Sequence, residues 1–293
     1  MKFGLALAGG GVKGAAHIGV LKALEEENVK IDCIAGTSSG SIVASLYAMG
    51  FSPDGIYKIF KKYCRKIKYV DFCYILKAIV GLIFTGKIVI DGLNSGKQIE
   101  RLISKVASNK GIYNINQIKM PLIIPSVDMC DGKLVCFSSC CKKECNLDKR
   151  SNYSDEVIFI KDVPICKAVR ASCSYPGVFS PCSFRETKLI DGGIRENVPW
   201  KELKMIGVDK ILSVTFEEEI DEGCCKNLIE VAVRAINLIC HELSNYEMED
   251  ADYNLKLKSN KVGLLDMSKI DELYYLGYNN TKQKINEIKN KLK

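Results

Sequence analysis

Hydrophobic residues follow two alternating patterns along the first fifty residues of the chain. Short apolar runs at residues 2–8 and 30–35 are typical of buried strands, whereas residues 12–27 and 41–50 have the longer spacing of helices. Strand, helix, strand, helix is the order that builds a parallel sheet covered by helices. We therefore predict an α/β fold, a three-layer α/β/α sandwich around a mostly parallel central sheet.

The rest of the chain continues this pattern around one polar insert at residues 139–154. Helical stretches extend to about residue 108, and the last residues, 281–293, are predicted as a lysine-rich helix. The other predicted elements are strands at 122–128, 133–138, 188–191 and 210–216 and helices at 164–173 and 226–246. Because no repeat or long linker divides the chain, we expect one domain over residues 1–293, with residues 217–293 as a mainly helical extension.

Charge and composition narrow the classes of partner. The formal net charge of +7, from 42 Lys and Arg against 35 Asp and Glu, suits an anionic surface better than a dedicated nucleic-acid groove. No zinc-finger, helix-turn-helix or RNA-recognition pattern accompanies the charge, so we expect no nucleic-acid partner. We expect a cytoplasmic protein, and the positive charge also suits peripheral contact with an anionic membrane.

Two apolar stretches and the cysteines indicate whether the chain is exported or spans a membrane. Residues 3–8 imitate a signal peptide but continue into a glycine loop, so we interpret them as the first strand. The stretch at residues 78–86 is too short to cross a bilayer. Fourteen cysteines without an export signal indicate reduced thiols rather than a disulfide framework.

The segment at residues 33–40, Cys-Ile-Ala-Gly-Thr-Ser-Ser-Gly, is an apolar strand followed by a G-x-S-x-G turn and a helix. This pattern is typical of a nucleophile elbow, in which serine occupies a sharp, strained turn and glycines remove Cβ atoms that would clash. Ser38 would project from the end of the sheet, in front of a helix N-terminus that stabilises developing negative charge. We predict Ser38 as a nucleophile.

A glycine loop, Gly-Gly-Gly-Val-Lys-Gly at residues 9–14, directly follows the first strand and also fits G-x-G-x-x-G. A dinucleotide site would need an acidic residue at the end of the second strand, but Asp32 begins that strand. The other use of such a loop is an oxyanion hole, in which backbone amides point at an anionic oxygen. We name Gly10, Gly11 and Val12 as the donors and keep dinucleotide binding as an alternative.

An activated serine needs a base, and the chain has only two histidines. His17 lies well inside the first helix and is predicted to pack or cap, and His241 has no motif around it. The best remaining base is Asp191, which ends a strand and precedes two glycines that permit close approach. Burial would raise its pKa toward neutrality. The alternative is that Asp191 is a turn residue before the two glycines.

The order and spacing of these motifs resemble the patatin-like phospholipase family, with Lys13 where the family often has arginine. In such a protein Lys13 either binds a lipid phosphate or caps and shields. The likeness covers residues 2–216 and includes residues 168–179 and 197–199. The glycines that carry it are Gly9, Gly14, Gly36, Gly40, Gly192 and Gly193. The resemblance implies an α/β/α fold, a Ser38–Asp191 dyad without histidine, and hydrolysis of acyl esters of lipids, with no cofactor and no metal. A catalytically silent lipid-binding module on the same fold stays the rival hypothesis.

Two further patterns have both a functional and a structural interpretation. Residues 55–70 form a basic amphipathic helix, which either docks on anionic membrane or packs its apolar face on the protein itself. A metal interpretation of the cysteines near the polar insert is disfavoured because they form no C-x-x-C pairs, so they are read as surface thiols. These are Cys130, Cys136, Cys140, Cys141 and Cys145.

Overall fold

The structure, a computed structural model, describes residues 1–64, 71–86, 91–140, 157–217, 228–248, 251–259, 262–263 and 266–291. At its centre, β1 (Phe3–Leu7) pairs in parallel with β2 (Cys33–Gly36) on one side and with β8 (Lys210–Glu217) on the other. Beyond β8, β9 (Tyr253–Lys258) adds another parallel strand. The strands read as continuous apolar runs because helices cover the sheet on both faces. The predicted α/β fold with a mostly parallel sheet is confirmed.

The other half of the sheet is mixed, and it brings two chain ends together. The first part of β3 (Leu122–Asp128) pairs in parallel with β2, and its last part pairs antiparallel with β7 (Thr187–Asp191). Both partners lie along the same edge of β3, one after the other, and run toward each other, so the ends of β2 and β7 meet. β3 also pairs antiparallel with β4 (Leu134–Ser138). Two further strands are β5 (Val157–Ile160) beside β4 and β6 (Cys182–Phe184) beside β7.

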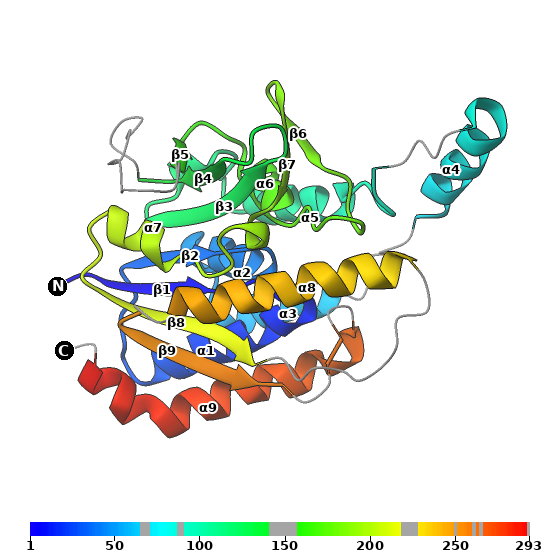
Figure 1. Ribbon diagram of the computed structural model, residues 1–293. Coiled ribbons are helices and arrows are strands. Elements are labelled where there is room, and N and C mark those ends of the chain that lie inside the picture. The colour runs from blue at the N-terminus through cyan, green and yellow to red at the C-terminus, as the bar shows by residue number, and fades with distance from the viewer. Residues whose placement is uncertain are drawn as a thin grey trace.

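Helices surround the sheet (Figure 1). On one face lie α1 (Gly14–Glu26), α2 (Ser39–Ala48) and α3 (Pro53–Cys64), and α7 (Trp200–Met205) packs on β1 and β2 from the other. Two helices pack on each other near β3, α5 (Lys97–Ser108) and α6 (Ile165–Ser172). The last two are α8 (Leu228–Glu247) and α9 (Ile270–Lys291), and α9 packs along α1. The helix α4 (Phe72–Thr85) stands away from all of them in Figure 1.

Sequence periodicity missed three short strands. Leu255 and Leu257 of β9 are fully buried while Lys256 and Lys258 are exposed, an alternation that predicts a strand but was overlooked in a region expected to be mainly helical. The strands β5 and β6 have four and three residues, too few for periodicity to identify. No helix in the described part of the chain combines the length and the apolar character needed to cross a membrane.

The basic amphipathic helix predicted at residues 55–70 is present as α3, and its continuation at 65–70 lies outside the described residues. Ile56 and Phe60 are buried in the core, so its apolar face packs on the protein itself. Lys58 is exposed, whereas the Lys61 ammonium lies 2.7 Å from a carboxylate oxygen of Asp271 in α9. The apolar face of α3 is therefore unavailable for docking.

Candidate active site

Ser38 occupies the turn between β2 and α2 with φ 51° and ψ −122°. A non-glycine residue in such a conformation costs about 1–3 kcal/mol, which the surroundings must hold in place. The neighbouring glycines are required: a Cβ on Gly36 would lie 2.4 Å from the Gly40 carbonyl oxygen, and one on Gly40 would lie 2.5 Å from that of Leu7. The Ser38 amide donates a hydrogen bond to Ser172 Oγ at 3.0 Å. The strained turn and its two close-packed glycines have the geometry that the predicted nucleophile elbow requires.

Asp191 ends β7 where β7 meets the end of β2. Its Oδ1 accepts a hydrogen bond from the Gly193 amide at 2.9 Å, whereas Oδ2 has no partner of ordinary geometry among the described residues. Burial raises the pKa of this carboxyl from 3.8 to about 7, against the Gly193 amide and the Ser38 hydroxyl, which favour the charged form. The carboxyl therefore changes its charge near neutral pH.

The glycine loop lies between β1 and α1. Gly10 and Gly11 have φ of +155° and +58°, which L side chains rarely adopt. The Gly9 amide donates to the side-chain oxygen of Asn197 at 3.1 Å, which holds the loop in place. The amides of Gly10, Gly11 and Val12 donate no backbone hydrogen bond within the described residues. These amides are available to an anionic oxygen.

One cavity of about 190 Å³ gathers most of the residues predicted from the sequence. Its lining includes Gly9, Gly10, Gly11, Val12, Lys13, Ser38, Asp191 and Gly193. The Lys13 ammonium lies 5.7 Å from the centre of the Phe216 ring. The remaining walls are largely apolar, with Ile42, Phe60, Ile99, Val178, Phe179 and Phe216 among them. The cavity therefore offers a largely apolar space beside Ser38.

The other predicted motif glycines serve packing outside this lining. A Cβ on Gly14 would lie 2.9 Å from the Ser39 Cβ, and one on Gly192 would lie 2.6 Å from the Pro125 carbonyl oxygen. Together with Gly36 and Gly40, they let the elbow, the loop and the end of β7 approach each other closely.

The two histidines have different surroundings. His17 is fully buried, its Nε2 donates to the Ala8 carbonyl oxygen at 2.8 Å, and burial lowers its pKa to about 4. It is a packed residue, as predicted. His241 lines the cavity from α8, 3.2 Å from the amide nitrogen of Asn245. Its place in the cavity was not anticipated from the sequence.

Sequence reasoning missed the contribution of α8. Its cavity-lining residues recur at the spacing of one helix face: Val233, Asn237, Cys240, His241 and Ser244. Two hydrogen bonds tie this face to the site, from Asn197 Nδ2 to Ser244 Oγ at 2.7 Å and from the Tyr175 hydroxyl to Asn237 Oδ1 at 2.8 Å. The spacing was visible in the sequence, but only the fold shows which structure this face covers.

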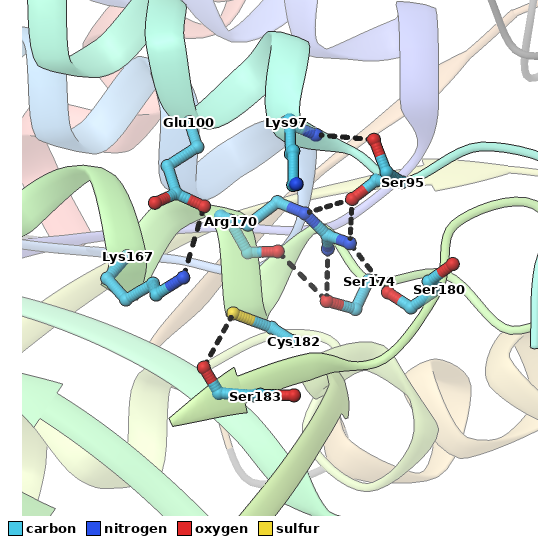
Figure 2. A network of polar contacts seen from close by, with 9 residues as sticks. All are labelled: Ser95, Lys97, Glu100, Lys167, Arg170, Ser174, Ser180, Cys182 and Ser183. Carbon is cyan, nitrogen blue, oxygen red and sulfur yellow. Dashed lines mark hydrogen bonds and ion pairs between the residues drawn. The ribbon is translucent and has the colours of Figure 1, made fainter. Parts of the chain in front are cut away.

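A buried arginine fixes one wall of the cavity (Figure 2). Arg170 of α6 donates from Nη2 to the carbonyl oxygens of Ser95 at 2.7 Å and Ser180 at 2.6 Å, and from Nη1 to the Ser174 hydroxyl. The guanidinium thereby joins the chain at Ser95, 75 residues away in sequence, to the segment that follows α6. The segment between Ser174 and Ser180 carries Val178 and Phe179 of the cavity wall.

The structure also bears on the dinucleotide and metal interpretations of the sequence. Asp32 accepts a hydrogen bond from the Phe3 amide at the start of β1, at the opposite edge of the sheet from the glycine loop, so it is not placed to bind a ribose there. Among the described residues, no three His, Cys, Asp or Glu side chains are grouped to hold a metal. Cys136 is buried, Cys130 exposed and Cys140 half-buried, and Cys141 and Cys145 lie outside the described residues.

Comparison with known proteins gives one family. The family model described as "Patatin-like phospholipase" matches residues 5–204. Lysophospholipase NTE1 of Candida albicans is 28% identical over 212 residues, which are 72% of this chain and 13% of that protein. The uncharacterized protein YqhO of Bacillus subtilis is 28% identical over 197 residues, 66% of this chain and 63% of that protein. The chain thus spans a small part of the lysophospholipases that it matches.

Among solved structures, human GIVD cytosolic phospholipase A2 superposes with a TM-score of 0.52 at 10% identity, over 99% of this chain and 62% of that one. This likeness concerns the fold, and it agrees with the mixed, mostly parallel sheet described above.

Proposed function

The chain belongs to the patatin-like phospholipase family, and from that premise we propose that it is a serine-dependent lipid acyl hydrolase of the phospholipase A or lysophospholipase type. Ser38 is its nucleophile and Asp191 its general base. The proposal rests above all on one observation: a strained serine and a carboxyl with a pKa of about 7 share one largely apolar cavity.

The chemistry follows from this arrangement. Ser38 Oγ attacks the ester carbonyl carbon while the Asp191 carboxylate accepts the hydroxyl proton. The carbonyl oxygen becomes an oxyanion that the amides of Gly10, Gly11 and Val12 stabilise. Collapse of this intermediate breaks the ester bond, and the leaving alcohol takes the proton from Asp191. Water then attacks the acyl-enzyme with Asp191 again as base, which releases the fatty acid and restores Ser38.

Lys13 is the candidate for recognition of a lipid head group. Its side chain is buried and lines the same cavity, beside the loop whose amides face an anionic oxygen. A cation there stabilises a phosphate ester more than a neutral ester, which favours phospholipids and lysophospholipids as substrates.

We also propose that residues 1–293 act as one domain. Support comes from β9, which extends the central sheet, and from α9, which lies against α1 at two glycines. A Cβ on Gly19 would lie 2.0 Å from the Tyr274 carbonyl oxygen, and one on Gly277 would lie 1.9 Å from that of Ala16.

Labelling with a fluorophosphonate tests the nucleophile, and mass spectrometry of mixed lipid vesicles identifies the products. The wild type should be labelled at one serine, and Ser38→Ala should abolish both labelling and release of fatty acid. His241→Gln is the control, because it changes a titratable side chain of the same cavity that has no part in the proposed proton transfer. A wild type that binds lipid but is never labelled would support the silent lipid-binding module instead.

A further inference from the structure

The helix α4 exposes apolar side chains that a protein in water normally buries. It is 14 residues long, and no other described helix or strand forms an extended contact with it. Phe72, Leu76, Val80 and Ile83 recur on one face of the helix. Among the side chains of α4 that the structure describes, the exposed fractions are 75% for Phe72, 51% for Leu76, 45% for Val80, 51% for Leu82, 71% for Ile83 and 81% for Phe84. Such a concentration marks an interaction surface.

The charge of residues 55–90, which include α4, favours an anionic partner. Residues 55–90 contain eight Lys and Arg and a single Asp, a formal charge of +7. The whole chain has 42 Lys and Arg against 35 Asp and Glu, which leaves 34 of each outside this segment. The chain around α4 therefore has a strong excess of positive charge, and of these cations Lys61 of α3 pairs with the carboxylate of Asp271. A second copy of the chain would be repelled by the same segment, whereas an anionic lipid surface attracts it.

The chain that carries α4 is joined to the cavity wall at its base. The Asp71 amide donates to the Leu93 carbonyl oxygen, and the amides of Leu93 and Asn94 both donate to that of Val178, all at 3.0 Å. Val178 lines the cavity, and the neighbouring Ser95 carbonyl accepts from the buried Arg170 (Figure 2). Before α4, Phe60 of α3 lines the same cavity. The base of α4 is thus joined by backbone hydrogen bonds to the chain that lines the cavity, while the helix itself extends away from the other helices (Figure 1).

We propose that α4 inserts its apolar face into the interface of an anionic phospholipid bilayer and brings the cavity to its lipid substrate. Fourteen residues of helix measure about 21 Å, less than the roughly 30 Å of a bilayer core, so α4 lies within one leaflet and does not span. Apolar insertion and electrostatic attraction then act together. The inference rests on the proposed function for the identity of the substrate, but the docking itself does not require catalysis.

The test uses the full chain and vesicles of phosphatidylglycerol and phosphatidylcholine in about equal parts. The double variant Ile83→Asn, Phe84→Asn removes two exposed apolar side chains without a change of charge or of core packing. It should weaken vesicle sedimentation at least about tenfold. The matched control is Tyr113→Asn, Met129→Asn, which changes two apolar side chains that are 65% and 60% exposed elsewhere on the surface. The control should bind within about twofold of the wild type.

Turnover of a water-soluble short-chain ester, measured in the same variants, separates docking from catalysis. We expect it to stay at the wild-type level in both double variants, while hydrolysis of the vesicle lipid falls only in the α4 variant. Vesicle binding that is unchanged in the α4 variant would overturn the inference, as would a wild type that self-associates through α4 without lipid. A wild type that binds vesicles through α4 but hydrolyses neither substrate would support the docking and refute the proposed function.

Discussion

The buried carboxyl of Asp191 makes opposite predictions for activity and for stability. Burial raises its pKa from 3.8 to about 7, so the folded protein holds a proton there over roughly three pH units in which the unfolded chain has lost it. At about 1.4 kcal/mol per unit, the charged form of Asp191 costs about 4 kcal/mol in the folded state. This cost is the upper bound on the stability that removal of the charge can restore.

Activity requires the carboxylate, because only the charged form accepts the Ser38 proton. The kcat/KM for a water-soluble ester should therefore fall about tenfold for each pH unit below about pH 7, and it should level off above that pH. Asp191→Asn removes the base and should lower kcat by several orders of magnitude, with Ser38→Ala, Asp191→Asn little worse than either single variant because both residues act as one unit.

Stability changes in the other direction. A folded-state pKa above the unfolded value contributes stability that is full below about pH 4 and is lost as the pH rises through about 7. Asp191→Asn removes the charge but keeps an oxygen that can accept from the Gly193 amide. The variant should therefore be more stable than the wild type at pH 8, by up to about 4 kcal/mol, and the difference should shrink as the pH falls toward about 4.

Thermal unfolding and a pH–rate profile, both from about pH 4.5 to about pH 9, measure the two effects. Glu202 of α7 provides the matched control, since burial also raises the pKa of this carboxyl but its side chain is not part of the cavity lining. Glu202→Gln should alter stability in the same direction and leave the pH–rate profile unchanged. A profile of the wild type that stays flat down to about pH 5, or an active Asp191→Asn protein, would refute Asp191 as the base.

Two further predictions concern the loop and the cavity wall. Gly10→Ala puts a Cβ 3.2 Å from the Phe216 ring at a φ of +155°, and it should lower kcat at least about tenfold. The control is Gly207→Ala, which has a φ of +82° and open space around it and should lower only stability. Equal kinetics in the two variants would refute the oxyanion assignment. Arg170→Met leaves buried carbonyl oxygens unpaired and should lower the free energy of unfolding, measured in urea, by about 3 kcal/mol. Lys167→Met, the control, removes a partly exposed ion pair from the same helix and should lower it by less than about 1 kcal/mol. Similar losses in the two variants would contradict the structural role of Arg170.

Local signals in the sequence were enough to predict the elements that carry the candidate site. The G-x-S-x-G turn at Ser38, the glycine loop at residues 9–14 and the carboxylate before two glycines at Asp191 each depend on a few consecutive residues. Backbone sterics act between residues that are close in sequence, so the strand-to-helix turn and the loop can be predicted without tertiary information. The catalytic roles of these residues stay predictions until they are tested.

Only the tertiary structure decided what these elements meet. The ends of β2 and β7 come together because both pair with the same strand, β3, and pairing between distant strands is not encoded in periodicity. The raised pKa of Asp191 results from that junction, since desolvation depends on everything packed around the carboxyl. Tertiary contacts also explain why α3 and α4 differ in the burial of their apolar faces. Both are rich in apolar residues, but α3 buries its apolar face and α4 leaves its own exposed, because burial depends on the surfaces available to each helix rather than on its own sequence.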